Sequence, residues 1–142
     1  MACVRQFVRE VPTDRTGCIS WKHLLQDSSC YTDGGLVKFL VGKIRELAPQ
    51  RGKIYIGLTH NPEFRWTVEG WGHCRTYKSM SVLLQGTPEE IRCAETQTVE
   101  AIYAGEGGAD LRYRIVNNQF TPQGALQPDK NGRTYLYVCW GR

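Results

Sequence analysis

The position of Glu95 on a predicted helix is the feature of the sequence that points most directly to chemistry. Residues 88–103 have a helical period, and Glu95 falls on their apolar stripe, whereas Glu100 lies on the opposite face. The other members of this stripe are Ile91, Ala94, Thr98 and Ile102. A carboxylate on a packed face is unfavourable unless it is paired, protonated or bound to a cation. Two interpretations follow: an ion pair with a nearby arginine, or a metal ligand in a cleft.

A phenol and a guanidinium occur upstream of this helix. Tyr55 and Gly57 share one face of a strand predicted over residues 53–59, because side chains alternate between the two faces of a strand. The glycine leaves space beside the phenol for a substrate backbone, although a β-bulge or tight packing explains it equally well. Arg65 follows eight residues after Gly57. A lone arginine is usually a solvated surface group, but beside a phosphate it forms a bidentate clamp.

Residues 60–79 are predicted to be polar and rich in turns, with tryptophans interleaved among basic residues. Trp66 or Trp71 either stacks on an exposed nucleic-acid base or belongs to the core, where tryptophan is mostly found. Arginine and lysine side chains in this stretch would contact phosphates. For His73, a position on the surface is the simplest interpretation.

The elements that must position these residues alternate between strands and helices. Further strands are predicted over residues 80–85, 112–116 and 134–140. Further turns and irregular segments are predicted over residues 1–33 and 129–132. A first helix is predicted over residues 36–47 and ends before Pro49. The second helix, over residues 88–103, has Thr87 as N-cap, Pro88 at its first position and Glu90 completing a capping box.

This order predicts an α/β or α+β fold, in which helices flank a small central, mainly antiparallel sheet. The chain has 142 residues, of which 41% are hydrophobic and 23% are charged. These values predict one compact domain over residues 1–142 and argue against disorder. No apolar run approaches the roughly 20 residues that a membrane span requires, and the N-terminus has no apolar region typical of a secretory signal.

Charge and cysteine content give weaker indications of partner and compartment. The formal net charge of +4 weakly favours a polyanionic partner, although such a charge also keeps a small domain in solution. The six cysteines form no CxxC pair and are interpreted as reduced thiols of an intracellular protein, in the cytoplasm or the nucleus. Zinc binding has little support from their spacing.

Several of these residues, in this order, resemble the motifs of the GIY-YIG nuclease superfamily. Tyr55-Ile56-Gly57 resembles the YIG half of the motif, and Arg65 and Trp66 resemble the residues that follow it. Glu95, on a helix after a strand, and Asn117, which precedes a second asparagine, resemble the family's later motifs. The resemblance covers core motifs within residues 53–119. It implies a GIY-YIG-like fold and hydrolysis of phosphodiester bonds in DNA.

The resemblance also implies a role for each matching residue. Glu95 would hold a divalent cation, Mg²⁺ or Mn²⁺, which stabilises the leaving oxygen. Tyr55 would act as general base or orient the attacking water, Arg65 would clamp the phosphate, and Asn117 or Asn118 would hold the site by hydrogen bonds. The substrate-binding residues, which rank below these, are Gly57, Trp66, His73, Tyr77 and Lys78. DNA is the implied partner, and a homodimer is one possible assembly for double-strand cleavage.

The family's first motif, GIY, is expected on a strand that pairs with the YIG strand. Gly17-Cys18-Ile19 is a degenerate candidate for it, and Gly42-Lys43-Ile44-Arg45 is another, although it lies within a predicted helix. Tyr31 is a candidate replacement for the family's first tyrosine. Two alternative functions stay open: a catalytically degenerate module that binds nucleic acid or protein, and a thiol hydrolase that pairs a cysteine with His23, His60 or His73.

Overall fold

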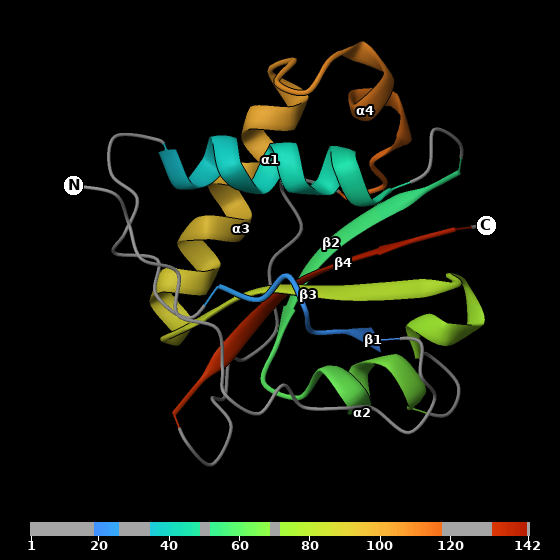
Figure 1. The fold of residues 1–142 in the computed structure, drawn as a ribbon, viewed down its shortest axis with the longest axis vertical. Coiled ribbons are helices and arrows are strands. Elements are labelled where there is room, and N and C mark those ends of the chain that lie inside the picture. The colour runs from blue at the N-terminus through green and yellow to red at the C-terminus, as the bar shows by residue number, and fades with distance from the viewer. Residues whose placement is uncertain (1–18, 26–34, 49–51, 69–71, 118–131, 142) are drawn as a thin grey trace.

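Four strands and their helices form the described part of a computed structural model of this chain, which covers residues 19–25, 35–48, 52–68, 72–117 and 132–141. The strands are β1 (Ile19–Ser20), β2 (Ile54–Thr59), β3 (Ser79–Gly86) and β4 (Thr134–Trp140). The helices are α1 (Gly35–Leu47), α2 (Pro62–Thr67), the 3₁₀ helix η2 (His73–Arg75), α3 (Pro88–Tyr103) and α4 (Ala109–Arg114). The predicted α+β class is therefore confirmed (Figure 1).

The sheet has the strand order β1-β3-β4-β2, so the last strand along the chain lies in its interior. β4 pairs antiparallel with β2 on one side and with β3 on the other. β1 pairs parallel with β3 at the far edge. The sheet is therefore mainly antiparallel, as predicted, and β4 joins its two halves.

The sequence signals for two helices, α3 and α1, are confirmed by the structure. Thr87 caps α3 by accepting a hydrogen bond from the Glu90 backbone N–H, and the Glu90 carboxylate accepts one from the Thr87 N–H at 2.9 Å. This is the predicted capping box, and it fixes where α3 begins. α1 likewise spans the predicted helix over residues 36–47.

Two segments fold differently from the predictions. Residues 112–116, predicted as a strand, belong mostly to α4, and only Ile115 pairs with a strand, through an isolated bridge to Ile54. The Gly-rich turn before α4 allows the chain to reverse and start a new helix, since Gly105, Gly107 and Gly108 all have positive φ. The polar segment 60–79 contains α2, which Asn61 caps through its side chain.

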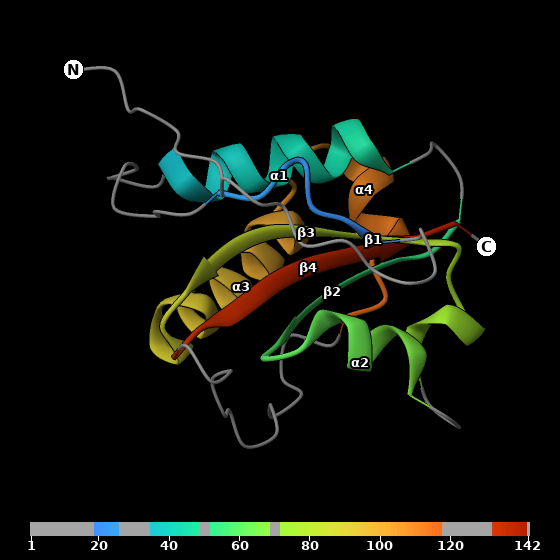
Figure 2. The same cartoon turned by 60° about the horizontal axis from the view of Figure 1, so that its bottom comes forward.

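The two faces of the sheet carry different cores. α1, α3 and α4 cover one face with aliphatic side chains, including Ile54, Ile56 and Leu136 from the strands. On the other face, beside α2 and η2, aromatic residues such as Trp66 and Tyr137 dominate. Figure 2 shows α1 and α4 above the sheet and α2 below it. Ile54 and Ile56 thus face away from Tyr55 and Gly57, as alternation predicts.

Several predictions concern residues outside the described ones: Gly17 and Cys18, Tyr31, Trp71, Asn118 and residues 129–131 of the predicted turn. Gly132, the last residue of that turn, is described and has a positive φ. Ile19 belongs to β1, whereas the sequence predicts an irregular segment over residues 1–33. Among the described residues, Cys74, Cys93 and Cys139 are free thiols. None of the described helices is both long and apolar enough to cross a membrane.

Candidate functional site

The pairing of β2 with β4 brings a second tyrosine beside Tyr55. In this ladder Gly57 lies opposite Tyr137, and Tyr55 lies opposite Cys139. The Tyr137 hydroxyl lies over Gly57, so closely that a Cβ at this position would overlap it. The space beside the Tyr55 phenol is therefore filled by Tyr137. The prediction that Gly57 leaves room for substrate is wrong, and the alternative of tight packing is right.

Four rings gather on this face into an aromatic cluster of Tyr55, His73, Tyr77 and Tyr137. The ring centroids of Tyr55 and His73 are 4.8 Å apart, and those of His73 and Tyr137 are 5.4 Å apart. His73 Nε2 and the Tyr137 hydroxyl share a hydrogen bond of 2.7 Å, in which the histidine tautomer decides the donor. Burial raises the pKa of Tyr55, and a side-chain hydrogen bond with Tyr137 opposes this shift. Tyr137 thus connects the Tyr55 phenol to the His73 imidazole.

Burial sets the protonation states within the aromatic cluster. His73 is 8% exposed, and burial, aided by the charge of Arg65, lowers its pKa to about 4. The imidazole is therefore neutral at pH 7. Burial raises the pKa of Tyr77 to about 12 and the pKa of Tyr55 and Tyr137 above their ordinary value. The phenols consequently stay protonated, and the only neutral base in the aromatic cluster is His73.

Arg65, on α2, acts electrostatically on the residues of the aromatic cluster. Burial raises the pKa of Tyr55 and Tyr137, and the positive charge of Arg65 opposes this rise; at His73 the same charge adds to the lowering of the pKa by burial. Trp66, the next residue, is 2% exposed and anchors α2 to the sheet. Arg65 itself is half-buried. Arg65 therefore lies within electrostatic reach of Tyr55.

Glu95 lies on the buried side of α3, with only 4% of its surface exposed. Its Oε2 atom is buried and has no hydrogen-bond partner. Burial raises the pKa of the Glu95 carboxyl to about 7, and the positive charge of Arg92 opposes this shift. The negative charge of Glu95 in turn raises the pKa of Tyr55 and Tyr137. The carboxylate is therefore within electrostatic reach of both phenols.

Asn117 holds the outer edge of β2. Its side-chain oxygen accepts a hydrogen bond from the Ile56 N–H at 2.7 Å, and its side-chain nitrogen donates to the Ile56 carbonyl at 2.5 Å. The Tyr103 hydroxyl, at the end of α3, donates to the Asn117 carbonyl oxygen. These bonds tie the ends of α3 and α4 to the strand that carries Tyr55, which is the supporting kind of contact predicted for Asn117.

The predicted substrate-binding residues divide by exposure. Trp66 packs in the aromatic core and has no free ring face, so the prediction that it stacks on a base is wrong. His73 and Tyr77 are buried within the aromatic cluster rather than on the surface. Lys78 is exposed, at the edge of β3 beside Gly141. Of Trp66, His73, Tyr77 and Lys78, only Lys78 is exposed to solvent.

Tyr137 is the site residue that sequence reasoning missed. The predicted strand over residues 134–140 already places Tyr135, Tyr137 and Cys139 on one face, but alternation does not reveal which strand lies alongside. β2, which carries Tyr55, pairs with β4. The earlier candidates are wrong: Ile19 pairs with Met80 in β3, and Gly42-Lys43-Ile44-Arg45 lies within α1.

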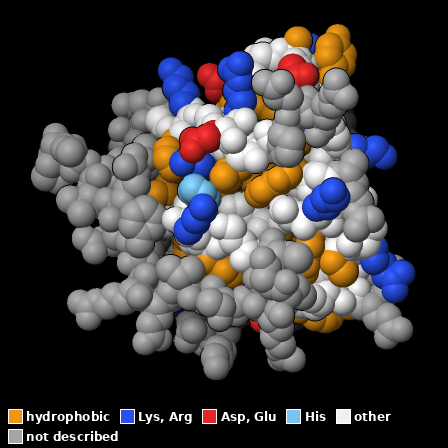
Figure 3. Space-filling model, turned by 45° about the vertical axis from the view of Figure 1, so that its right-hand side comes forward, with side chains coloured by type: hydrophobic (Ala, Val, Ile, Leu, Met, Phe, Trp, Pro, Cys, Tyr) orange, Lys and Arg blue, Asp and Glu red, His pale blue; other side chains and the backbone are white. Residues whose placement is uncertain are grey.

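The lysine and arginine side chains on the face shown in Figure 3 do not form one compact patch. Figure 3 shows lysine and arginine side chains spread over one face of the molecule, separated by apolar and neutral ones. Within the described residues, no three histidine, cysteine, aspartate or glutamate side chains come close enough to hold a metal ion. Comparison of the chain with family models, curated proteins and solved structures gives no match.

Proposed function

We propose that this protein is a divalent-metal-dependent endonuclease that hydrolyses phosphodiester bonds in DNA. The observation that carries the proposal is the Glu95 carboxylate, whose buried Oε2 has no hydrogen-bond partner and whose charge acts on Tyr55. A buried, unsatisfied carboxylate oxygen is unfavourable and calls for a proton or a cation. Arg65, whose charge acts on the same phenol, supplies a group suited to phosphate.

The residues present fit one kind of metal site. Mg²⁺ is commonly held by one or two carboxylates, with substrate phosphate and water completing its shell. Glu95 would supply the protein ligand of such an ion. When bound, the cation supplies positive charge that stabilises the transition state and the leaving oxygen. A closed site built of several protein ligands does not fit, because no such group exists among the described residues.

The remaining residues orient the reactants and move a proton. Arg65 binds the scissile phosphate, and the Tyr55 hydroxyl orients the attacking water. A protonated phenol can accept a proton only if it passes its own proton on. Tyr137 and the neutral imidazole of His73 offer a route for that proton, through the hydrogen bond of 2.7 Å between them. Asn117 keeps Tyr55 in position through the backbone of Ile56.

The alternative function is a module that binds nucleic acid or protein without cutting it. The raised pKa of Glu95 favours this alternative below pH 7, where the carboxyl is protonated and holds no cation. Cleavage that increases between pH 6 and 8, and that EDTA abolishes, supports the nuclease. Binding that is insensitive to EDTA, without any nicking of plasmid, supports the module.

The decisive experiment is cleavage of plasmid and branched DNA with Mg²⁺, Mn²⁺ or EDTA. We expect Glu95→Gln and Glu95→Ala to abolish cleavage while DNA binding remains. Glu100→Gln is the matched control, because Glu100 is exposed on the same helix. Full activity of both Glu95 variants would exclude the proposed metal ligand. The ratio of nicked to linear plasmid shows whether one site or a homodimer acts on the two strands.

Arg65→Ala separates catalysis from docking. If Arg65 serves the transition state, its loss reduces the cleavage rate more than the affinity for DNA. Equal losses in rate and affinity would mean that Arg65 is a docking contact only. Affinity is measured by fluorescence anisotropy in EDTA, where no cleavage interferes.

A further inference from the structure

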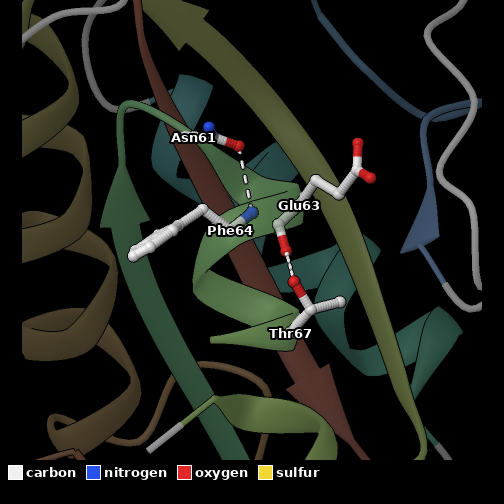
Figure 4. Close-up of a pocket in the computed structure, with 4 residues that line it drawn as sticks. All are labelled: Asn61, Glu63, Phe64 and Thr67. Carbon is white, nitrogen blue, oxygen red and sulfur yellow. Dashed lines mark hydrogen bonds between the residues drawn. The ribbon is translucent and has the colours of Figure 1, made fainter. Parts of the chain in front are cut away.

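An open pocket of about 310 Å³ lies on α2, lined by Asn61, Glu63, Phe64 and Thr67. Its volume is near the lower end of the range for small-molecule sites, roughly 300–1,000 Å³. Figure 4 shows the ring of Phe64 extending from the helix, with Asn61 at the start of the helix and Thr67 one turn from Glu63. Phe64 is 46% exposed, so it presents an aromatic surface at the pocket.

The polar groups of this pocket offer both a donor and an acceptor. Asn61 Oδ1 accepts the hydrogen bond of the Phe64 N–H at 3.0 Å, and the Asn61 side-chain nitrogen is a further donor. The Thr67 hydroxyl donates to the Glu63 carbonyl oxygen at 2.8 Å and keeps its lone pairs as acceptors. An aromatic ring flanked by an amide and a hydroxyl is suited to a flat, polar-edged ring such as a nucleobase. The Glu63 side chain adds a negative charge, which disfavours a phosphate in the pocket itself.

The pocket and the proposed phosphate clamp lie on the same helix. Phe64 and Arg65 are consecutive residues of α2, and their side chains leave the helix about 100° apart. Arg65 acts on the aromatic cluster on one side of α2, whereas Phe64 faces solvent on another. A nucleotide has the same arrangement, since its base and its phosphate project from one sugar.

We propose that the pocket at Phe64 is a subsite for one unpaired nucleobase next to the phosphate at Arg65. This inference rests on the proposed nuclease function and adds a substrate class to it: DNA with at least one unpaired nucleotide beside the cut. The base stacks on Phe64, and its edge meets Asn61 and Thr67. In a continuous duplex both faces of the base are already stacked, so this contact is lost.

The test compares the affinity of the full chain for two DNA molecules in EDTA: a labelled duplex with one unpaired nucleotide and the fully paired duplex of the same sequence. We expect tighter binding to the first. Phe64→Ala should reduce that preference about tenfold, and Phe64→Trp should restore it. Tyr113→Ala is the matched control, because Tyr113 is an 83% exposed ring on α4, away from the pocket. Emission from 2-aminopurine at the unpaired position reports stacking directly.

The outcomes separate the subsite from the nuclease. A preference that survives in Phe64→Ala, or that Tyr113→Ala reduces equally, overturns the subsite. Cleavage by the wild type without any preference for unpaired nucleotides also overturns it and leaves the nuclease standing. A Phe64-dependent preference in a protein that cuts no DNA supports the subsite and excludes the nuclease. Circular dichroism of each variant excludes unfolding as the cause.

Discussion

The two faces of the sheet are built from the same strands but differ in what they can do. Ile56 and Leu136 belong to an aliphatic core under α1 and α3. One residue further along each strand, Gly57 and Tyr137 belong to the other face, where the Tyr137 hydroxyl packs against Gly57 and hydrogen-bonds with the His73 imidazole. Burial of the aliphatic face stabilises the fold. On the aromatic face, packing also holds the tyrosine hydroxyls and the His73 imidazole in fixed positions.

The largest expected effect is on the aliphatic face. Leu136 is fully buried there, so Leu136→Ala should lower the free energy of unfolding by about 3 kcal/mol. Urea denaturation measures the loss. The ¹⁵N signals of His73 should keep their positions in the folded variant, since Leu136 points away from the aromatic cluster. A shifted His73 signal would mean that the two faces are not independent.

Gly57→Ala tests the packing of the aromatic face. The new methyl group would overlap the Tyr137 hydroxyl and approach Tyr55, and the displacement should destabilise the protein by about 2 kcal/mol. Gly42→Ala is the control, because Gly42 lies in α1 with open space around it. That variant should be about 0.5–1 kcal/mol more stable than the wild type. Equal stabilities of the two variants would contradict the close contact at Gly57.

The pH dependence of stability distinguishes the two buried titratable groups. Burial raises the pKa of Glu95 from 4.5 to about 7, so the folded state holds this proton more tightly and stability is lost as the pH rises through 7. Burial lowers the pKa of His73 from 6.5 to about 4, so its contribution is lost as the pH falls through 4. Between pH 4.5 and 6.5, the Glu95 contribution to the free energy of unfolding falls as the pH rises, whereas the His73 contribution increases.

Glu95→Gln removes the Glu95 contribution to the pH dependence of stability, because glutamine does not titrate. The free energy of unfolding of this variant, relative to the wild type, should fall by about 2 kcal/mol as the pH is lowered from 6.5 to 4.5. Thermal and urea denaturation at several pH values measure the difference. A difference that does not change with pH would mean that Glu95 titrates near its ordinary value.

The smallest effect is expected for Tyr137→Phe. It removes one hydroxyl from the hydrogen bond with His73, which should destabilise the protein by only about 1 kcal/mol. The imidazole ¹⁵N shifts of His73 should nevertheless change clearly, because Nε2 loses its partner. Unchanged shifts would show that the hydrogen bond does not persist in solution.

Local patterns in the sequence predict the elements well, and long-range pairing accounts for what they miss. The capping box at Thr87 and the alternation over residues 53–59 depend on neighbouring residues, and both predictions are confirmed. Residues 112–116 are predicted wrongly because their strand-like composition yields to the turn that precedes α4. The stripe on residues 88–103 predicts the burial of Glu95. Tyr137 is missed because its partner, Gly57, is eighty positions away and no local signal connects them.

The interior position of β4 has a consequence for the order in which the molecule can assemble. A ribosome makes β2 and β3 long before the strand that must lie between them. Until Thr134 and the residues after it leave the exit tunnel, β2 and β3 lack the strand that joins them, and His73 lacks the Tyr137 hydroxyl as a hydrogen-bond partner. A nascent chain therefore cannot complete the aromatic cluster, and a message that stops before codon 134 yields a product that lacks Tyr137.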